Sequence, residues 1–332
     1  MTILILGAAG MIGRKLTDRL IADSTLLKAD EKLILHDIIT PPSPANHANT
    51  LCLSGDLALA ETAMQLAAYQ PDIIFHLASM VSGDAERQFD KGWSVNMQGS
   101  WHLCEALKTY HHASEGRYRA KMIFASSIAV FGPPFPDTDF GAIDDDFLCA
   151  PQTSYGAQKA MIELLIADYA RKGFIDGLSI RLPTICVRPG KPNGAASSFF
   201  SGIIREPLNG IEAILPVPDT IRHWHASPNS AAGFMVHAAG LDTNLLGGRR
   251  SLNMPGVSCT VAEQIEALRD CAGEDVIARI KPEIDDTIVT IVSNWPRAFN
   301  PQRAISLGFK AEDNFRQIIE IYLQDDMPSK PV

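Results

Sequence analysis

Short apolar runs in the first half of the chain alternate with segments whose apolar residues have helical spacing. The expected strands are Ile3–Leu6, Leu33–His36, Leu51–Leu53, Ile73–His76, Met122–Ala125 and Leu178–Arg181, and the expected helices lie near 11–22, 57–69, 85–110 and 154–172. Strands that alternate with helices form a parallel sheet covered on both faces. This order predicts an α/β fold built on a doubly wound parallel sheet.

The sequence changes character after Arg181. Segment 183–194 is rich in Pro and Gly and should form a loop. Helical patterns then recur near 197–206, 228–240, 260–271 and 313–324. We therefore expect a sheet domain over 1–182, to which some later segments return, and a smaller lobe, mainly for substrate binding, over 183–332.

The N-terminal stretch ILILGAAGMIGRKL places three glycines between the first strand and the first helix. Glycines allow a tight turn, a close approach to a pyrophosphate and close packing of helix on strand, and the helix N-terminus favours the anion. The context, a strand before and a helix after, supports a Rossmann-type dinucleotide site. Its expected cofactor-binding residues are Gly7, Gly10, Met11, Ile12 and Gly13.

Asp37 follows the second expected strand. A carboxylate there can accept hydrogen bonds from both ribose hydroxyls of the adenosine and repels a 2′-phosphate. The alternative is a solvated aspartate at a strand end. With the glycine turn nearby, we expect the ribose role and NAD, not NADP, as the cofactor.

Tyr155 and Lys159 are four residues apart in SYGAQKA, so on a helix they share one face. A base that takes a proton from an alcohol near neutral pH needs a pKa closer to 7 than the value of about 10 of free tyrosine. A nearby ammonium favours the ionised phenol. We expect a proton-transfer site, and an exposed helical pair is the alternative.

Composition excludes several classes of partner. The net charge of −9 argues against nucleic acid or an anionic membrane, and no stretch approaches the roughly 20 apolar residues of a spanning helix. The N-terminus lacks the basic region of a signal peptide, and the six cysteines lack CxxC spacing. We expect a cytoplasmic protein with reduced thiols.

Five motifs stand in one order along the chain: GAAGMIG, GDL at 55–57, HLAS at 76–79, SSIAVFG at 126–132 and SYGAQK at 154–159. In this order they resemble the extended short-chain dehydrogenases/reductases, the NAD-dependent epimerase/dehydratase family. The resemblance implies that Ser127, Tyr155 and Lys159 are catalytic, with Tyr155 as acid/base and Ser127 and Tyr155 binding the substrate oxygen. It also implies cofactor contacts from Asp56, Leu57, Leu77, Ala78, Ser79, Asn96, Tyr155, Lys159 and Pro183.

Ile128 and Ala129 stand where sugar-nucleotide dehydratases of this family carry an Asp-Glu pair. Without that eliminating acid and base, dehydration is not expected. Simple dehydrogenation and epimerisation both remain open.

The segment RLPTICVRPGKPNGAASSFFSGIIREPL, with IRHWHASPNSAAGF, is similar to one branch of the family, the D-erythronate dehydrogenases, and more loosely to L-threonine dehydrogenases. The resemblance implies NAD-dependent oxidation of the C2 hydroxyl of a small sugar acid to 2-oxo-tetronate. The alternatives are a nucleotide-sugar epimerase, a 3-hydroxy dehydrogenase of the L-threonine type, and a non-catalytic NAD sensor.

A sugar-acid substrate carries a carboxylate, whose burial needs a guanidinium or a helix N-terminus. Arg222 is favoured for this role with Ser197 in support, and Arg188 is a further candidate. A salt bridge between domains or on the surface is the alternative for Arg222.

His223 and His225 flank Trp224 and would share one face of a strand. No carboxylate or cysteine lies at ligand spacing, so we expect packing or substrate hydrogen bonding and no metal. Trp93 and Trp101 are expected in a core or a subunit interface. The resemblance implies a homodimer through the helices at 85–110 and 154–172.

Overall fold

The computed structural model describes residues 1–135, 142–190 and 196–327, and the chain falls into two compact units. Unit 1 comprises 1–130, 149–181 and 232–253. Unit 2 comprises the described residues of 131–148, 182–231 and 254–332. The chain therefore returns to unit 1 twice, over 149–181 and over 232–253, before it ends in unit 2.

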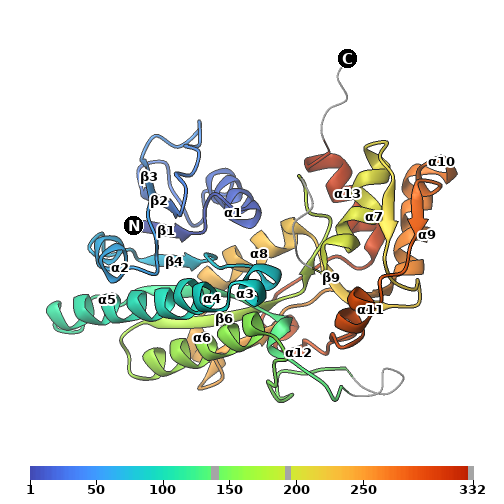
Figure 1. Ribbon diagram of the computed structural model, residues 1–332. Helices are drawn as coiled ribbons and strands as arrows, with labels where there is room; N and C mark the ends of the chain where they lie inside the picture. Colours follow the sequence, from blue (N-terminus) through green and yellow to red (C-terminus); the bar gives the residue numbers. More distant parts are fainter. Residues whose placement is uncertain (136–141, 191–195, 328–332) are drawn as a thin grey trace. The chain divides into compact units, whose positions relative to one another are not determined.

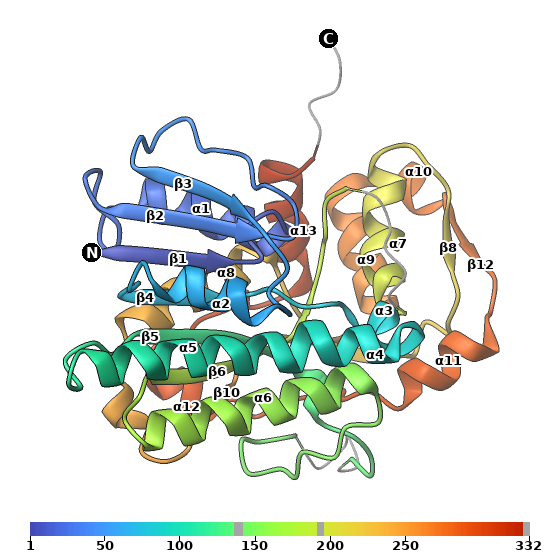
Figure 2. The ribbon, with the colours of Figure 1, turned by 60° about the vertical axis from the view of Figure 1, so that its left-hand side comes forward.

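The core of unit 1 (Figure 1) is a seven-stranded sheet in the order β10-β6-β5-β4-β1-β2-β3, whose strands are labelled in Figure 2. Its strands are β1 (Thr2–Leu6), β2 (Lys32–Asp37), β3 (Thr50–Ser54), β4 (Ile73–His76), β5 (Lys121–Ser127), β6 (Asp176–Leu182) and β10 (Ser251–Asn253). The pairs β1–β2, β2–β3, β1–β4, β4–β5 and β6–β10 are parallel. The predicted doubly wound fold and all six predicted strands are confirmed.

The strand order reverses between β1 and β4, because the chain first builds β1, β2 and β3 outward and then crosses to the other side of β1. In such sheets ligands bind at the carboxyl ends of the two strands where the order reverses. The fold thus selects the ends of β1 and β4 as the place for a cofactor.

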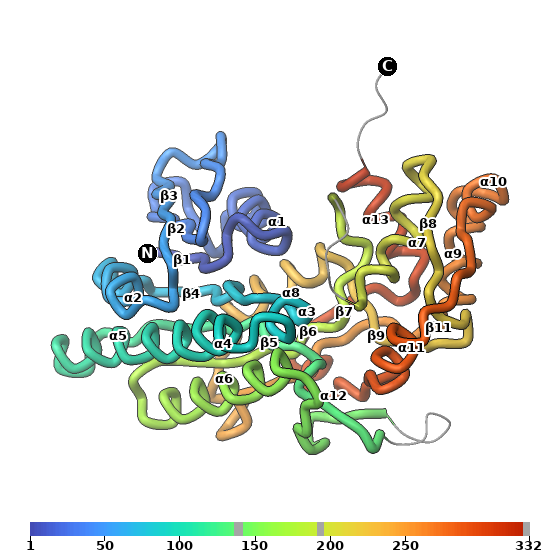
Figure 3. Tube along the Cα trace, in the orientation of Figure 1, coloured from blue at the N-terminus to red at the C-terminus, as the bar shows by residue number. Residues whose placement is uncertain are grey.

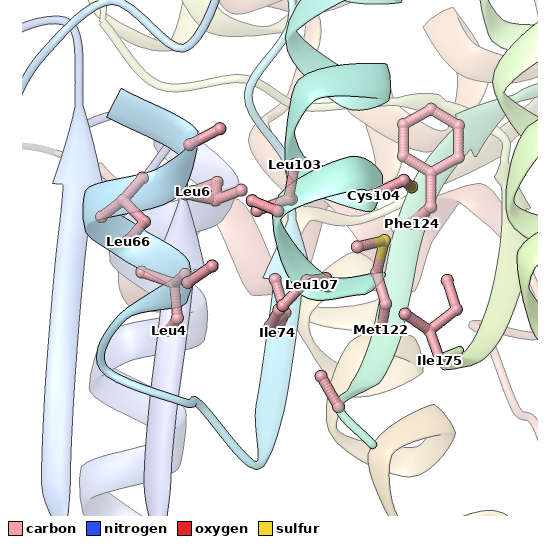
Figure 4. Packing of buried hydrophobic residues seen from close by; sticks show 14 of the residues in the cluster. Leu4, Leu6, Leu66, Ile74, Leu103, Cys104, Leu107, Met122, Phe124 and Ile175 are labelled. Carbon is pink, nitrogen blue, oxygen red and sulfur yellow. The ribbon is translucent and has the colours of Figure 1, made fainter. Parts of the chain in front are cut away.

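Helices cover both faces of this sheet (Figure 2). On one face lie α2 (Ala60–Ala67), α5 (Gly99–Ala113) and α6 (Ser154–Arg171), and on the other α1 (Met11–Ala22) and the part of α8 (Pro228–Gly240) that belongs to this unit. Figure 4 shows Leu4, Ile74 and Met122 of the strands packed against leucines of α2 and α5. Burial on both faces explains why these strands read as continuous apolar runs.

The single helix expected over 85–110 is wrong. The chain instead forms α3 (Ser82–Arg87), α4 (Phe89–Gly92), a π-helical stretch η1 (Trp93–Gln98) and then α5. Glycines bound the stretch: a Cβ on Gly92 would lie 3.0 Å from Gln158 Nε2, and one on Gly99 would lie 3.1 Å from the carbonyl oxygen of Leu57. The wider turn seats the side chain of Asn96, which bonds groups outside its own helix, and such π stretches are frequent at functional sites.

Unit 2 is built from small sheets and helices (Figure 3). One sheet has the order β11-β9-β7, from β7 (Thr184–Ile185), β9 (Arg222–Ala226) and β11 (Val257–Thr260), and β8 (Ala213–Leu215) pairs with β12 (Ile280–Pro282). Its helices are α7 (Ser198–Leu208), α9 (Val261–Ala272), α10 (Glu274–Ile277), α11 (Asp286–Ser293), α12 (Gln302–Ser306) and α13 (Phe315–Asp325).

Residues of α7, α9 and α13 share one buried apolar cluster in unit 2. The helices predicted near 197–206, 228–240, 260–271 and 313–324 are confirmed as α7, α8, α9 and α13. None of the helices in the described part of the chain is long and apolar enough to cross a membrane.

Candidate active site

The glycine turn joins β1 to α1 in a conformation that side chains would disturb. Gly7 has φ +83°, and its N–H donates to the carbonyl of His36 over 2.9 Å. A Cβ on Gly13 would lie 2.3 Å from the carbonyl oxygen of Gly7, and one on Gly7 would lie 2.7 Å from the nitrogen of Ala78. The turn therefore packs against both α1 and the segment after β4, and only glycine fits at either position.

The N-terminus of α1 supplies the groups that a diphosphate needs. Gly10 is the N-cap residue, and Met11 and Ile12 open the first turn. The first N–H groups of a helix lack partners within it and lie at the positive end of its dipole. The missing Cβ atoms and these donors fit the phosphates of a dinucleotide.

Asp37 ends β2 beside the glycine turn. Its Oδ2 accepts a hydrogen bond of 2.9 Å from the N–H of Ala9, and its Oδ1 one of 2.7 Å from the N–H of Ile38. These two bonds orient the carboxylate next to the turn, which is the placement expected for a ribose ligand. Asp56, after β3, accepts from the N–H of Ala58 over 2.9 Å, and Leu57 beside it is buried.

Asn96 ties the segment after β4 to α6. Its Oδ1 accepts from the N–H of Met80 over 2.7 Å and from Ser79 Oγ over 3.1 Å. Its Nδ2 donates to Gln158 Oε1 over 2.6 Å. Leu77, Ala78 and Ser79 are thus fixed against the glycine turn on one side and, through Asn96, against the helix that carries Lys159 on the other.

Helix α6 presents Tyr155 and Lys159 on one face. Thr153 caps it by accepting from the N–H of Gly156 over 3.1 Å. Lys159 Nζ lies 5.4 Å from the centre of the Tyr155 ring and donates to the carbonyl of Ala125 over 2.8 Å. Lys159 is 2% exposed and is therefore fixed in the interior, whereas Tyr155 is partly exposed.

Gly156 allows α6 to lie directly against the end of β5. A Cβ at this position would lie 2.1 Å from the carbonyl oxygen of Ala129. The N–H of the same Ala129 donates to Ser127 Oγ over 3.1 Å. The close approach places the segment with Ser127 beside the first turn of α6, which carries Tyr155.

Burial sets the charges around this site. Desolvation lowers the pKa of the Lys159 ammonium to about 7, and the nearby charge of Glu163 opposes this effect. Burial, and to a smaller extent the charge of Lys159, lowers the pKa of His76 to about 3, so that histidine is neutral. A charged lysine beside a phenol favours the phenolate, which is the form that accepts a proton from an alcohol.

The residues predicted to bind the substrate carboxylate lie in unit 2, whereas Ser127 and Tyr155, predicted to bind the substrate oxygen, lie in unit 1. Arg188 donates from Nη2 to Ser197 Oγ over 2.8 Å and from Nε to the carbonyl of Ile185 over 3.0 Å, and Ser197 is the N-cap residue of α7. Arg222 donates to the carbonyl of Ser258 over 3.0 Å and pairs with Glu263 Oε2 over 3.1 Å. Pro183 lies between β6 and β7.

His223 and His225 share one face of β9, with ring centres 5.3 Å apart. His223 bonds Thr184 Oγ1 over 2.7 Å and the carbonyl of Pro296 over 3.0 Å, and His225 bonds Gln264 over 3.0 Å. Both are buried, and burial lowers the pKa of His223 to about 4. They pack in the core of unit 2, and the described residues contain no cluster of three or more possible metal ligands.

Gln158 and Glu163 of α6 were not singled out from the sequence, although both are buried beside the predicted catalytic residues. Glu163 stands four residues after Lys159, so the helical spacing that paired Tyr155 with Lys159 also extends to this acid.

The model of the NAD dependent epimerase/dehydratase family matches residues 3–246. The chain belongs to this family. The predicted family and the predicted cofactor, NAD, are therefore confirmed, and the protein is an NAD-dependent oxidoreductase by the same evidence.

Its relatives match over nearly the whole chain. The D-erythronate dehydrogenase of Haemophilus influenzae is 39% identical, over 98% of this chain and 100% of that protein. The D-erythronate dehydrogenase of Cupriavidus necator is 41% identical, over 98% of each.

Solved structures of similar fold carry other names. A nucleoside-diphosphate-sugar epimerase from Agrobacterium tumefaciens is 49% identical with a TM-score of 0.93, over 98% of this chain and 94% of that one. An L-threonine dehydrogenase from Clostridium difficile is 23% identical with a TM-score of 0.82, over 97% and 96%. The latter supports the fold alone.

Replacing Gly13 by Ala should weaken NAD binding by about 10- to 100-fold, because the new Cβ displaces the carbonyl of Gly7 and distorts the glycine turn. Gly240→Ala is the matched control, since a Cβ there has no neighbour within 4 Å. Titration calorimetry with NAD checks both variants. Equal affinity in Gly13→Ala and the wild type would contradict the role of the turn.

Proposed function

We propose that this protein oxidises the C2 hydroxyl of D-erythronate with NAD, giving 2-oxo-tetronate and NADH. The observation that carries the proposal is similarity over nearly the full length to two D-erythronate dehydrogenases, in a chain that keeps Ser127, Tyr155 and Lys159. The hydrogen bond of Lys159 to Ala125 and its place beside the Tyr155 ring support it, because this pairing suits proton transfer from an alcohol.

Each group of predicted site residues has its own role in this reaction. The glycine turn and the N-terminus of α1 would hold the diphosphate of NAD, and Asp37 would accept hydrogen bonds from the adenosine ribose. When bound, NAD supplies the acceptor for the hydride of C2. Tyr155, as phenolate, takes the proton of the C2 hydroxyl, Ser127 hydrogen-bonds the same oxygen, and Lys159 stabilises the phenolate.

An epimerase of nucleotide sugars is the second candidate, favoured by the name of the 49% identical solved structure. Such an enzyme regenerates its cofactor in each cycle and yields no net NADH. The same proton-transfer residues serve either reaction, so the discrimination lies in the substrate. The L-threonine dehydrogenases match at less than 25% identity and support only a shared fold.

We further propose that Arg188 binds the substrate carboxylate together with Ser197. The two predicted residues are joined by a hydrogen bond at the N-terminus of α7, where the helix dipole favours an anion. Arg222, which the sequence favoured, is paired with Glu263, whose backbone and side chain complete a capping box with Thr260. If Arg222 bound the substrate carboxylate, its ion pair with Glu263 would be lost, so Arg188 is the better candidate for this role.

A homodimer in the cytoplasm completes the proposal. The adjacent helices α5 and α6 leave large apolar side chains exposed: Trp101 at 46%, Met161 at 42% and Leu164 at 72%. A second copy of the chain would cover them, as the family resemblance implies. All six cysteines are free thiols, which supports a reducing compartment.

Incubation with NAD and D-erythronate should give sustained growth of NADH absorbance. Tyr155→Phe should lower kcat by about 10²- to 10⁴-fold, since the base is gone, with NAD affinity nearly unchanged. Turnover of a UDP-sugar without net NADH, and no reaction with four-carbon acids, would contradict the dehydrogenase and support the epimerase. Wild-type activity in Tyr155→Phe would remove the assigned base.

Arg188→Met should raise KM for D-erythronate about 10- to 100-fold, because a charged hydrogen bond to the carboxylate is lost, with NAD affinity retained. Arg222→Met is the matched variant and should change KM little. Steady-state kinetics checks both. The reverse ranking would assign the carboxylate to Arg222 instead.

Leu164→Glu should yield monomers, because a charge among the exposed apolar side chains of α5 and α6 opposes their burial against a second copy. Leu245→Glu is the control, since Leu245 is 66% exposed but lies in η3 (Thr243–Leu246), away from α5 and α6 in sequence. Light scattering gives the mass of each. A monomeric wild type would refute the dimer.

A further inference from the structure

Glu163 lies on α6 one helical turn after Lys159 and is 5% exposed. Tyr155, Lys159 and Glu163 follow one another at intervals of four residues, so they form a stripe on one side of the helix. A buried carboxylate is costly unless charges and hydrogen bonds satisfy it. The groups that bind the carboxylate of Glu163 therefore indicate its role.

Two elements of the sheet provide those partners. Arg181 of β6 donates to both oxygens of Glu163, from Nη2 to Oε2 over 2.8 Å and from Nε to Oε1 over 3.0 Å. Ser126 of β5 donates its hydroxyl to Oε1 over 2.5 Å. Arg181 is itself held by Asn253 Oδ1 at 3.3 Å and Cys149 Sγ at 3.4 Å. The carboxylate is thus fixed by a two-pronged guanidinium and one hydroxyl.

The contacts of Glu163 lie next to those of the predicted catalytic residues along β5. At the end of β5 the carbonyl of Ala125 accepts from Lys159, and the hydroxyl of Ser126 donates to Glu163. Ser127, the predicted catalytic hydroxyl, comes next. Two successive residues of β5 are therefore joined to two successive turns of α6, immediately before Ser127.

The charges around Lys159 come from several elements. Burial lowers the pKa of Lys159 to about 7 and the negative charge of Glu163 opposes this shift. His76 of β4 is buried and neutral, and Arg181 of β6 is positive and bound to Glu163. Among the charged groups described around the ammonium, Glu163 is thus the one whose charge favours it.

We propose that Glu163, anchored by Arg181, is a positioning residue that keeps Lys159 charged and holds the end of β5 against α6. This role rests on the proposed proton transfer and adds Glu163 to the residues that support it. Glu163 contacts neither of the predicted reacting hydroxyls in the bonds described, so it acts through Lys159 and Ser126.

Two variants that break the same ion pair separate this role from simple stabilisation. Glu163→Gln keeps the shape of the side chain but removes its negative charge, so two buried cations remain. The alkaline limb of the kcat–pH profile, where Lys159 loses its proton, should move down by about one pH unit. Arg181→Gln leaves the negative charge of Glu163 next to Lys159. The alkaline limb of the kcat–pH profile of this variant should therefore move to higher pH. Affinity for NAD should change little in either.

A purely structural pair would lower thermal stability in both variants without opposite shifts. Shifts in the same direction, or none, overturn the proposal. Opposite shifts support it.

A measurement on the unmodified protein covers the case in which a variant does not fold. Selective nitrogen-15 labelling of lysine reads the charge of Lys159 by NMR, with Lys159→Arg identifying its signal. The ammonium should be charged at about pH 6, and a neutral amine there overturns the proposal. This reading needs no substrate. A charged Lys159 in a protein that oxidises no sugar acid would refute the proposed function and leave the role of Glu163 standing.

Discussion

The rest of the site depends on the interactions that stabilise the buried ammonium of Lys159. A lysine that is 2% exposed remains charged only where the protein replaces its water, and here the carbonyl of Ala125, the ring of Phe124 at 4.5 Å and the charge of Glu163 do so. The carbonyl and the ring become available because α6 lies directly on the end of β5, and Glu163 is supplied by α6 itself. Gly156 permits that approach, since any side chain there would collide with the carbonyl of Ala129.

The parallel sheet explains why the residues predicted to bind one cofactor are distant in sequence. Parallel strands end at a common edge, so the glycine turn after β1, Asp37 after β2, Asp56 after β3 and Ser79 after β4 all follow strand ends in unit 1. Hydrogen bonds at this edge, such as those that Ala9 donates to Asp37 and Ser79 donates to Asn96, fix the segments before any ligand binds. By the family resemblance, Ile128 and Ala129 stand where dehydratases carry an Asp-Glu pair, so this difference lies outside the loops after β1 to β4.

The sequence predicts those parts of the structure whose causes are local. Six strands, the glycine turn and the Tyr155–Lys159 face follow from apolar periodicity and fixed spacing. Strand β10 was missed because three residues, Ser251–Asn253, carry too little pattern, and only the neighbouring β6 makes them a strand. The π stretch was missed because it depends on Asn96 reaching Met80 and Gln158, which lie in other segments.

Long-range ion pairs were also beyond sequence reasoning. Arg181 meets Glu163, and Arg222 meets Glu263, only after strands and helices have assembled. The sequence around an arginine in a loop or strand looks the same whether its guanidinium binds a substrate or forms an ion pair with an acid of its own chain. This is why Arg222 stood out in the sequence, and why its pairing with Glu263 shifts attention to Arg188.

We propose that Ser127, Tyr155 and Lys159 surround one reacting carbon beside the nicotinamide. A crystal structure of the chain with NAD and D-erythronate tests this most directly. Ser127 Oγ and Tyr155 Oη should both hydrogen-bond the C2 oxygen, with C2 about 3–3.5 Å from C4 of the nicotinamide. A phenol directed into solvent, or a C2 oxygen bound by neither hydroxyl, would contradict it.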